Sequence, residues 1–432
     1  MKKFKKLLFI AILLCPLFCL ARNSDVYIGI SSKYDPNSLP KIALASFGYS
    51  QDEPEAQESS NTISNTLRSD LMRTRYFELE ENLGLVDIKN IASSLNLART
   101  KKADYLVFGE LALMVNGSWE IKAFVYDTQS QKAVLAKKFV SSTKGLRRAA
   151  HLLSDQIVKL LYGKRGIADT KIAFSNDATG RKEIYMVDYD GYNLKKLTKD
   201  RSINLLPRWS SDGTKIFYTT YRNNNPDIFY IDLKAGKISS LVKGGGLNLI
   251  GGVSPDDSKI VFTMSRGENA SIFIKELDTG NLRQLTDKYG VDGSPSFSPD
   301  GKFVTYVSNR SGNPQIYIFD LTTKQTRRLT KFNWTDTPQW SPNGDWIVFS
   351  GRQDPHHPID LFLVDITGSQ IRQLTADSGN NEDPFWSPDG RFIVFTTTRS
   401  GQRQIYVMDG DGSAQHLVAN LKGNSFTPTW SK

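Results

Sequence analysis

A motif that recurs six times in the second half of the chain constrains the fold more than any other feature of the sequence. Each copy has a large apolar residue, then Ser, usually Pro-Asp-Gly, and then an apolar segment; the copies begin at Trp209, Val253, Phe297, Trp340, Trp386 and Trp430. The spacings between successive copies are 44, 44, 43, 46 and 44 residues. A period in this range is typical of repeated supersecondary units. We therefore expect six similar units.

The copy at Phe297 predicts the structure of one unit. Ser298-Pro299-Asp300-Gly301 has the chemistry of a tight turn, because Pro fixes φ and Gly accepts φ > 0. Segments rich in β-branched and aromatic residues follow at 303–307, 316–320 and 327–330, and residues 336–340 lead into the next copy. Four short antiparallel strands per unit are the pattern of a β-propeller blade. Single copies depart from the consensus turn at Ser211, Asp257 and Asn343.

The two ends of the repeat region complement each other. The region begins within a unit, at residues 171–175, and its last copy, at 428–432, stops where the missing piece would end. We therefore predict that Pro428 and Trp430 belong to the inner strand of the first blade, which closes the ring and leaves no open sheet edge. The fold class expected for residues 171–432 is an all-β six-bladed β-propeller with four-stranded blades.

Residues 1–21 have the pattern of a secretory signal peptide that is cleaved near Ala21. Four lysines precede an apolar segment, residues 7–20, which is too short for a comfortable membrane span. An uncleaved anchor is the alternative. Both cysteines, Cys15 and Cys19, lie in this segment, so the mature chain would have no disulfide and no thiolate metal ligand. Loss of the four lysines lowers the formal charge from +10 to +6, and the scattered basic residues do not indicate nucleic-acid binding.

Residues 22–162 lack the repeat and are predicted to form an α+β domain. Strands are expected at 41–45, 104–109, 119–127 and 133–140, and helices at 59–73, with Ser59 or Ser60 as the cap, at 85–97 and at 146–161. About 140 residues can bury a core of their own. Residues 163–170, which include Gly163 and Gly166, are predicted to be a linker.

The whole mature chain resembles the TolB family, periplasmic components of the Tol–Pal system of Gram-negative bacteria. The resemblance rests on the signal segment, an α+β domain containing Ala103-Asp104-Tyr105-Leu106-Val107-Phe108-Gly109, a glycine-containing linker and the six repeats. It implies a periplasmic adaptor that supports outer-membrane integrity and envelope constriction during division. It also implies two partners: the lipoprotein Pal, bound by the propeller, and TolA, bound by the segment Asp25, Val26, Tyr27, Ile28, Gly29 and Ile30.

The TolA-binding segment alternates apolar and other residues, which suits addition as a strand to a partner's sheet edge. It could equally lie back on its own propeller or linker, or be a permanent edge strand of the first domain. For Pal, we expect the propeller face formed by the loops that lead into the inner strands and the loops between second and third strands. The candidate residues are Asn248, Asp292, Arg310, Asp336, Arg352, His356, Asn381, Glu382 and Arg399. An ordinary solvated loop face is the alternative.

An enzyme is the competing class, as a secreted propeller hydrolase or lyase with a rim active site. The chain has no Gly-x-Ser-x-Gly motif and only four histidines, which argues against it. We expect no metal or cofactor: His356-His357 have no third ligand at a recognisable spacing, and Asp188-Tyr189-Asp190-Gly191 suits a hairpin turn better than a calcium loop. The repeated aromatic residues are expected to be wedges between blades rather than ligand platforms. The chain is expected to be a monomer, attached to the outer membrane only through Pal.

Overall fold

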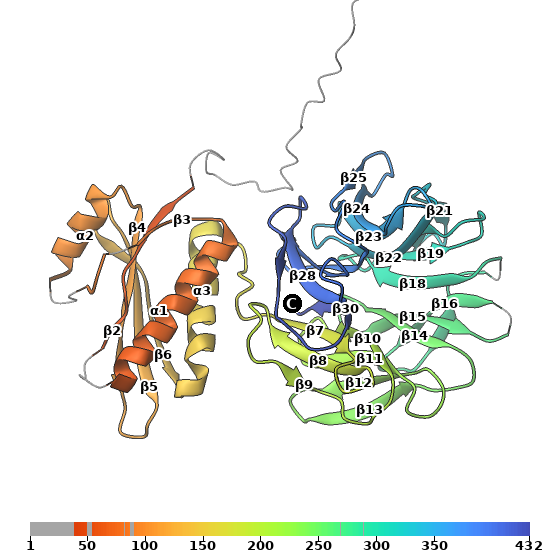
Figure 1. The fold of residues 1–432 in the computed structure, drawn as a ribbon, viewed down its shortest axis with the longest axis horizontal. Helices are drawn as coiled ribbons and strands as arrows, with labels where there is room; N and C mark the ends of the chain where they lie inside the picture. Colours follow the sequence, from red (N-terminus) through yellow and green to blue (C-terminus); the bar gives the residue numbers. More distant parts are fainter. Residues whose placement is uncertain (1–38, 50–53, 82, 87–89, 268, 288) are drawn as a thin grey trace, which may run out of the picture. The chain divides into compact units, whose positions relative to one another are not determined.

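The computed structural model describes residues 39–49, 54–81, 83–86, 90–267, 269–287 and 289–432 (Figure 1). The predicted signal peptide and the predicted TolA-binding residues 25–30 lie outside this part of the chain. All described residues belong to one compact unit, which begins with a mixed sheet and helices and continues as a six-bladed β-propeller. The predicted fold class is therefore confirmed. Among the described helices, none is both long enough and apolar enough to cross a membrane.

The amino-terminal part has a six-stranded sheet of order β3-β1-β4-β5-β6, with β2 paired to β4. Strand β1 runs parallel to β3 and β4, whereas β4, β5 and β6 are antiparallel. Among its described residues, three helices and the 3-10 turn η2 complete it. The bounds are β1 Lys41–Leu44, β2 Gly48–Tyr49, α1 Pro54–Thr74, β3 Glu78–Glu80, α2 Ile91–Thr100, β4 Tyr105–Leu113, β5 Trp119–Asp127, β6 Lys132–Ser141, η2 Thr143–Gly145 and α3 Leu146–Tyr162.

Helix α1 begins earlier than predicted. It starts at Pro54, a residue whose fixed φ suits a first helical turn, and Ser59 and Ser60 are buried in its interior instead of capping it. The hydroxyl of Ser60 donates to the carbonyl of Phe47, and the N–H of Phe47 donates to the hydroxyl of Ser64 at 3.0 Å. The serines therefore attach the helix to the sheet, because buried hydroxyl groups need partners.

Helix α2 was predicted to begin at residue 85 but begins at Ile91, because Leu85 instead forms a parallel bridge with Ser46. Helix α3 agrees with its prediction. It ends at Gly163, whose φ of +72° and N–H bond to the carbonyl of Lys159 make the left-handed cap that glycine adopts without strain.

The propeller has six four-stranded antiparallel blades. From inner to outer strand, their bounds are β30 Ser425–Trp430, β7 Lys171–Asn176, β8 Glu183–Asp188 and β9 Lys195–Lys196 in blade 1; β10 Asn204–Trp209, β11 Lys215–Thr220, β12 Asp227–Asp232 and β13 Lys237–Val242 in blade 2; β14 Asn248–Val253, β15 Lys259–Ser265, β16 Ala270–Glu276 and β17 Leu282–Gln284 in blade 3; β18 Asp292–Phe297, β19 Phe303–Ser308, β20 Gln315–Asp320 and β21 Thr326–Arg328 in blade 4; β22 Trp334–Trp340, β23 Trp346–Arg352, β24 Asp360–Asp365 and β25 Ile371–Gln373 in blade 5; β26 Asn381–Trp386, β27 Phe392–Thr397, β28 Gln404–Asp409 and β29 His416–Leu417 in blade 6.

Blade 1 joins the two ends of the propeller. The carboxy-terminal strand β30 pairs with β7, so that Trp430 lies opposite Ile172. Trp430 is 3% exposed, packs with residues of blades 1 and 6, and donates its indole N–H to the hydroxyl of Thr170 at 2.7 Å. Trp209 packs in the same way between blades 1 and 2. The predicted ring closure and the wedge role of these aromatic residues are confirmed.

Candidate functional site

The propeller has two distinct faces, which the strand pairings define. Asp292, Ser308 and Gln315 are paired at the end of blade 4 where its inner strand begins. We call the corresponding end of all six blades the start face. The Ser-Pro-Asp-Gly turns lie at the opposite end, which we call the turn face; there the N–H of Gly301 donates to the carbonyl of Ser298 at 2.9 Å, and φ of Gly301 is +70°. The turn chemistry predicted for the repeat is therefore present.

Three of the predicted Pal-binding residues are buried at the start face. Asn248, Asp292 and Asn381 are the first residues of their inner strands, not members of the preceding loops as predicted. The amide of Asn248 donates to the carbonyls of Gly244 and Gly246, and that of Asn381 donates to Asp360 at 3.1 Å. These side chains hold the loops on the blades, because buried polar groups must be hydrogen-bonded. Their part in binding remains a prediction.

Loop arginines complete the blade ends. Arg310 lies 3.2 Å from the carboxylate of Asp292 and 5.2 Å from the ring centroid of Tyr317. Arg399 donates to Asn381 at 3.3 Å and lies 4.6 Å from the centroid of the Tyr406 ring. Burial opposes the charge of Arg310, but Tyr306, Asp292 and Asp287 outweigh it and raise the pKa of the guanidinium. Both arginines were predicted to belong to the Pal-binding face, and the structure packs each of these two side chains over an aromatic ring.

Of the remaining predicted residues, Asp336 and Glu382 lie in inner strands, whereas Arg352 and His356 lie at the end of β23 and in the loop that follows it. Asp336 accepts hydrogen bonds from Ser294 at 2.6 Å and from the N–H of Thr337 at 2.7 Å, and burial raises the pKa of Asp336. Glu382 pairs with Arg403 at 2.5 Å. Arg352 lies 5.9 Å from the ring of Trp334, and His356 is exposed on the loop that follows. The structure therefore does not bring all nine residues into one contiguous surface.

Sequence reasoning missed exposed apolar residues at the start face. Tyr289 is 85% exposed and Val291 is 51% exposed, and both precede β18. Val291 also lines a pocket of about 220 Å³ whose walls include Leu206, Leu247 and Ala270. An exposed aromatic residue beside an apolar pocket is typical of protein–protein contact sites. Their signal in the sequence was an aromatic and a β-branched residue inside an otherwise polar loop.

The channel beneath is enclosed by all six inner strands. Its part near the turn face is a cavity of about 380 Å³, and Arg208 lines both this cavity and the start-face pocket. The guanidinium Nε of Arg208 donates to the carbonyl of Gly251 at 2.7 Å. Burial lowers the pKa of Arg208 to about 10. The channel therefore contains a poorly solvated cation.

The amino-terminal part contacts the turn face beside blades 1 and 6. The guanidinium of Arg391 lies 4.5 Å from the ring centroid of Tyr76, and Arg75 pairs with Asp409 at 2.9 Å. A groove of about 320 Å³ lies between α1, the segment before β7 and these blades; it is lined among others by Arg73, Tyr189, Phe392 and Trp430.

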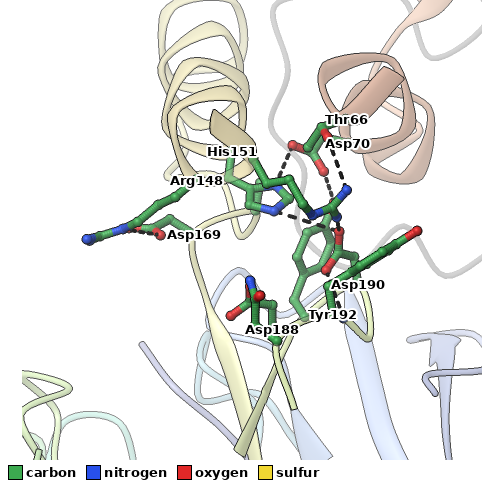
Figure 2. A network of polar contacts seen from close by, with 12 residues as sticks. Thr66, Asp70, Arg148, His151, Asp169, Asp188, Asp190 and Tyr192 are labelled. Carbon is green, nitrogen blue, oxygen red and sulfur yellow. Dashed lines mark hydrogen bonds and ion pairs between the residues drawn. The ribbon is translucent and has the colours of Figure 1, made fainter. Parts of the chain in front are cut away.

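Beside this groove is a polar network that the sequence did not reveal (Figure 2). His151 of α3 lies 2.8 Å from Asp70 of α1 and 3.7 Å from Asp190, which belongs to the turn after β8. All three side chains are buried. Each had a detectable signal: Asp70 falls on the apolar face of α1, and His151 falls on that of α3. Asp190 was assigned to a hairpin turn, which it does form, since the N–H of Gly191 donates to the carbonyl of Asp188 at 2.9 Å.

The metal alternatives considered for the sequence find no support in the geometry of the loops. His356 and His357 are exposed, and in the described chain neither belongs to a set of three ligand-type side chains that lie close together. Asp409-Gly410-Asp411-Gly412 resembles the Asp188 segment in sequence and is also a turn, with a φ of +91° at Gly412. Asp70, His151 and Asp190 are the only such set among the described residues.

Comparisons with known proteins agree with the fold. The family model "TolB beta propeller domain" matches residues 158–432, and "TolB amino-terminal domain" matches residues 28–134. The Tol-Pal system protein TolB of Desulfosudis oleivorans is 32% identical over 220 residues, or 48% of each chain, and that of Geobacter sulfurreducens is 43% identical over 89 residues, or 21% of each. These matches therefore span half or less of the relatives' lengths.

Among solved structures, the crystal structure of TolB from Acinetobacter baumannii superposes with a TM-score of 0.77 at 26% identity, covering 92% of this chain and 97% of that one. A chain of a nidogen/laminin complex matches with a TM-score of 0.51 at 11% identity, which shows a shared fold only. The propeller family model alone covers more than half of the sequence. The chain therefore belongs to the TolB family.

Proposed function

We propose that the chain is a non-enzymatic periplasmic adaptor of a Tol–Pal system. It binds the lipoprotein Pal through the start face and TolA through residues 25–30, and it is exported with cleavage near Ala21. The observation that carries this proposal is the succession of both TolB domains along one chain. The names of the relatives, Tol-Pal system protein TolB, support the same assignment.

The start face supports a protein partner better than a small substrate. Its exposed apolar residues, Tyr289 and Val291, stand beside a pocket that is small and mainly apolar. The packed arginines Arg310 and Arg399 offer a rigid polar surround. Central aromatic anchors with a polar periphery are the usual arrangement of binding energy in protein interfaces.

Pal binding is tested by calorimetry with the soluble domain of the Pal-type lipoprotein from the same organism. Tyr289→Ser and Val291→Ser should each weaken binding about tenfold or more, which corresponds to the loss of roughly 1.4 kcal/mol or more of contact energy. The matched control is Leu282→Ser, since Leu282 is 39% exposed on the outer strand of blade 3. Equal losses in the control, or full affinity in both start-face variants, would contradict the placement of the site.

TolA binding is tested separately by deleting residues 22–33. The deleted form should lose affinity for TolA and keep its affinity for Pal, because the two partners use different segments. Undiminished TolA affinity would show that residues 25–30 are not the binding segment. Turnover of a peptide or glycan by the purified chain would instead support the hydrolase or lyase alternative.

A further inference from the structure

His151 occupies the contact between the amino-terminal helices and the propeller (Figure 2). Its Nδ1 lies 2.8 Å from a carboxylate oxygen of Asp70, on α1. Its Nε2 lies 3.7 Å from a carboxylate oxygen of Asp190, on the turn after β8. One imidazole ring therefore faces two aspartates, one from each side of the contact.

The surroundings of this ring are buried and tied to both sides. His151 is 2% exposed and Asp70 is 1% exposed. The hydroxyl of Tyr189, next to Asp190, donates to the second oxygen of Asp70 at 2.5 Å. Arg147, one turn before His151 on α3, pairs with Asp190 and lies 3.6 Å from the ring centroid of Tyr192. Water therefore has little access to screen the charges.

The protonation state of His151 decides whether its contact with Asp190 attracts or repels. One oxygen of Asp70 accepts the hydroxyl of Tyr189, and the other faces Nδ1 of His151; with Asp70 ionised, Nδ1 carries the proton. In the neutral ring, the lone pair of Nε2 then points toward a carboxylate oxygen. In the protonated ring, Nε2 carries an N–H on the side of Asp190; at 3.7 Å this contact is an ion pair and not a hydrogen bond, so Nε2 is buried without a hydrogen-bond partner within the described chain. The negative charges of Asp70 and Asp190 are then balanced by the positive charges of Arg147 and the protonated His151.

A metal ion fits these residues poorly. Asp70 uses both oxygens, for His151 and for Tyr189, and Asp190 is already paired with the guanidinium of Arg147. Only Nε2 of His151 remains free to coordinate, and a cation there would stand beside another cation. The set is better suited to hold a proton than a metal.

We propose that His151 is a proton-operated latch between the amino-terminal domain and the propeller. Protonated, it holds Asp190 and thereby fixes α1 and α3 on blade 1; when it loses its proton, the contact becomes repulsive and the two parts move more freely. The charged and titratable groups that act on it are Asp70 from α1, Arg147 from α3, and Tyr189 and Asp190 from the turn; Arg73 of α1 acts on Tyr189, and Asp155 of α3 interacts with Asp70.

The electrostatic surroundings agree with this direction. Burial opposes the charge of the ring, but the hydrogen bond to Asp70 and the charges of Asp70 and Asp190 outweigh it and raise the pKa of His151. A histidine with a raised pKa in the closed state stabilises that state fully at pH values below its ordinary pKa. The stabilisation is lost as the pH rises through the raised value, so the latch opens on the alkaline side.

The first test is a titration of the four histidine rings by NMR in the full chain. His151 should titrate above 6.5, the ordinary value for histidine. Asp190→Asn should lower the pKa of His151, and this substitution should leave the NMR signals of the other three rings unchanged. A wild-type pKa at or below the ordinary value would overturn the proposal, and this measurement needs no variant to fold.

The second test measures the latch directly. Two spin labels report the distance between the two parts. One is attached at Val115→Cys, on a fully exposed hairpin tip, and the other at Thr322→Cys, an exposed position in blade 4. Cys15 and Cys19 are changed to Ser so that only these two sites are labelled. We expect one narrow distance distribution at pH 6 that broadens at pH 9, with the latched population falling up to tenfold for each unit of pKa shift. His151→Gln should be broad at both values, and the exposed-ring control His357→Gln should behave like wild type. Equal widths at both pH values in wild type, or a pH response retained in His151→Gln, would overturn the latch.

Discussion

At the scale of single residues, the repeats supply their own controls. Arg310 follows the second strand of blade 4, Arg352 ends the second strand of blade 5, and both lie over aromatic rings. Arg310 also faces Asp292, a carboxylate with no exposed surface. Arg352 has only a carbonyl, that of Pro355 at 3.4 Å, and no ion pair with a described carboxylate. The two positions differ mainly in the buried charge beneath the guanidinium.

We therefore predict that Arg310→Ala lowers the free energy of unfolding by about 3 kcal/mol, because it leaves the Asp292 carboxylate buried and unpaired. Arg352→Ala should cost about 1 kcal/mol or less, since it removes a ring contact and no ion pair with a described carboxylate. Urea denaturation of both variants measures the difference. Adding Asp292→Asn to Arg310→Ala should recover part of the loss, and equal costs at the two arginines would refute the argument.

At the scale of the turns, two departures from the repeat explain each other. In later blades, the turn glycine lies against the proline of the preceding turn, as Gly301 does with Pro255. Blade 2 has Ser211 in place of that proline and so retains an N–H. Blade 3 has Asp257 in place of the glycine, at φ +57°, and its carboxylate accepts the N–H of Ser211 at 2.6 Å. The aspartate thus satisfies the donor that the missing proline exposes.

A double-mutant cycle tests this pairing. Asp257→Gly relieves a left-handed backbone but orphans the N–H groups of Ser211 and Asp212, so we predict a net loss of stability. Ser211→Pro alone should also destabilise, because the carboxylate loses one of its donors. The double variant restores the consensus turn and should be more stable than the sum of the single effects by roughly 0.5–3 kcal/mol in urea denaturation. Additive effects would show that the two substitutions are independent.

At the scale of the whole molecule, one carboxylate ties the amino-terminal part to the segment that enters the propeller. Asp155 on α3 accepts the N–H of Ala168 at 2.8 Å and that of Asp169 at 3.1 Å. Burial raises the pKa of Asp155 to about 6, against the hydrogen bonds from these two residues. The folded state therefore binds the proton of this group more tightly than the unfolded state does.

The sign follows for stability. The contribution of Asp155 is most favourable below about pH 4 and falls as the pH rises to about 6, by roughly 3 kcal/mol at about 1.4 kcal/mol per unit. Asp155→Asn cannot titrate, so its unfolding free energy should change less between pH 4.5 and pH 7 than that of the wild type. Asp169→Asn is the control, because Asp169 is paired with Arg148 near the surface. An unaltered pH dependence in Asp155→Asn would exclude this tie.

The repeat made most of the fold predictable from the sequence. The polar contacts between distant parts of the chain could not be predicted in this way. Turn chemistry and alternation specify blades locally, and the phase of Trp430 predicted ring closure. The start of helix α1 was mispredicted because Ser59 and Ser60 suit a cap by local propensity, whereas both are buried within the helix and Ser60 bonds to Phe47 across the fold. The contact of His151 with Asp190 joins elements that share no local pattern. The predicted exposure of the site residues was wrong for the same reason. In the sequence Asp292 looks like a loop carboxylate, and only the fold shows that it is buried beneath Arg310.

Closure of the ring by β30 also has a consequence for synthesis. Ile172 cannot pair with Trp430 until the last residues of the chain have been made. At about 5–20 residues per second, the edge of β7 then waits on the order of 10–50 s without its neighbour. The propeller therefore cannot close before residue 430 has been made, and until then β7 keeps an unpaired edge. The position of β30 therefore means that the propeller is completed only after its synthesis, not during it.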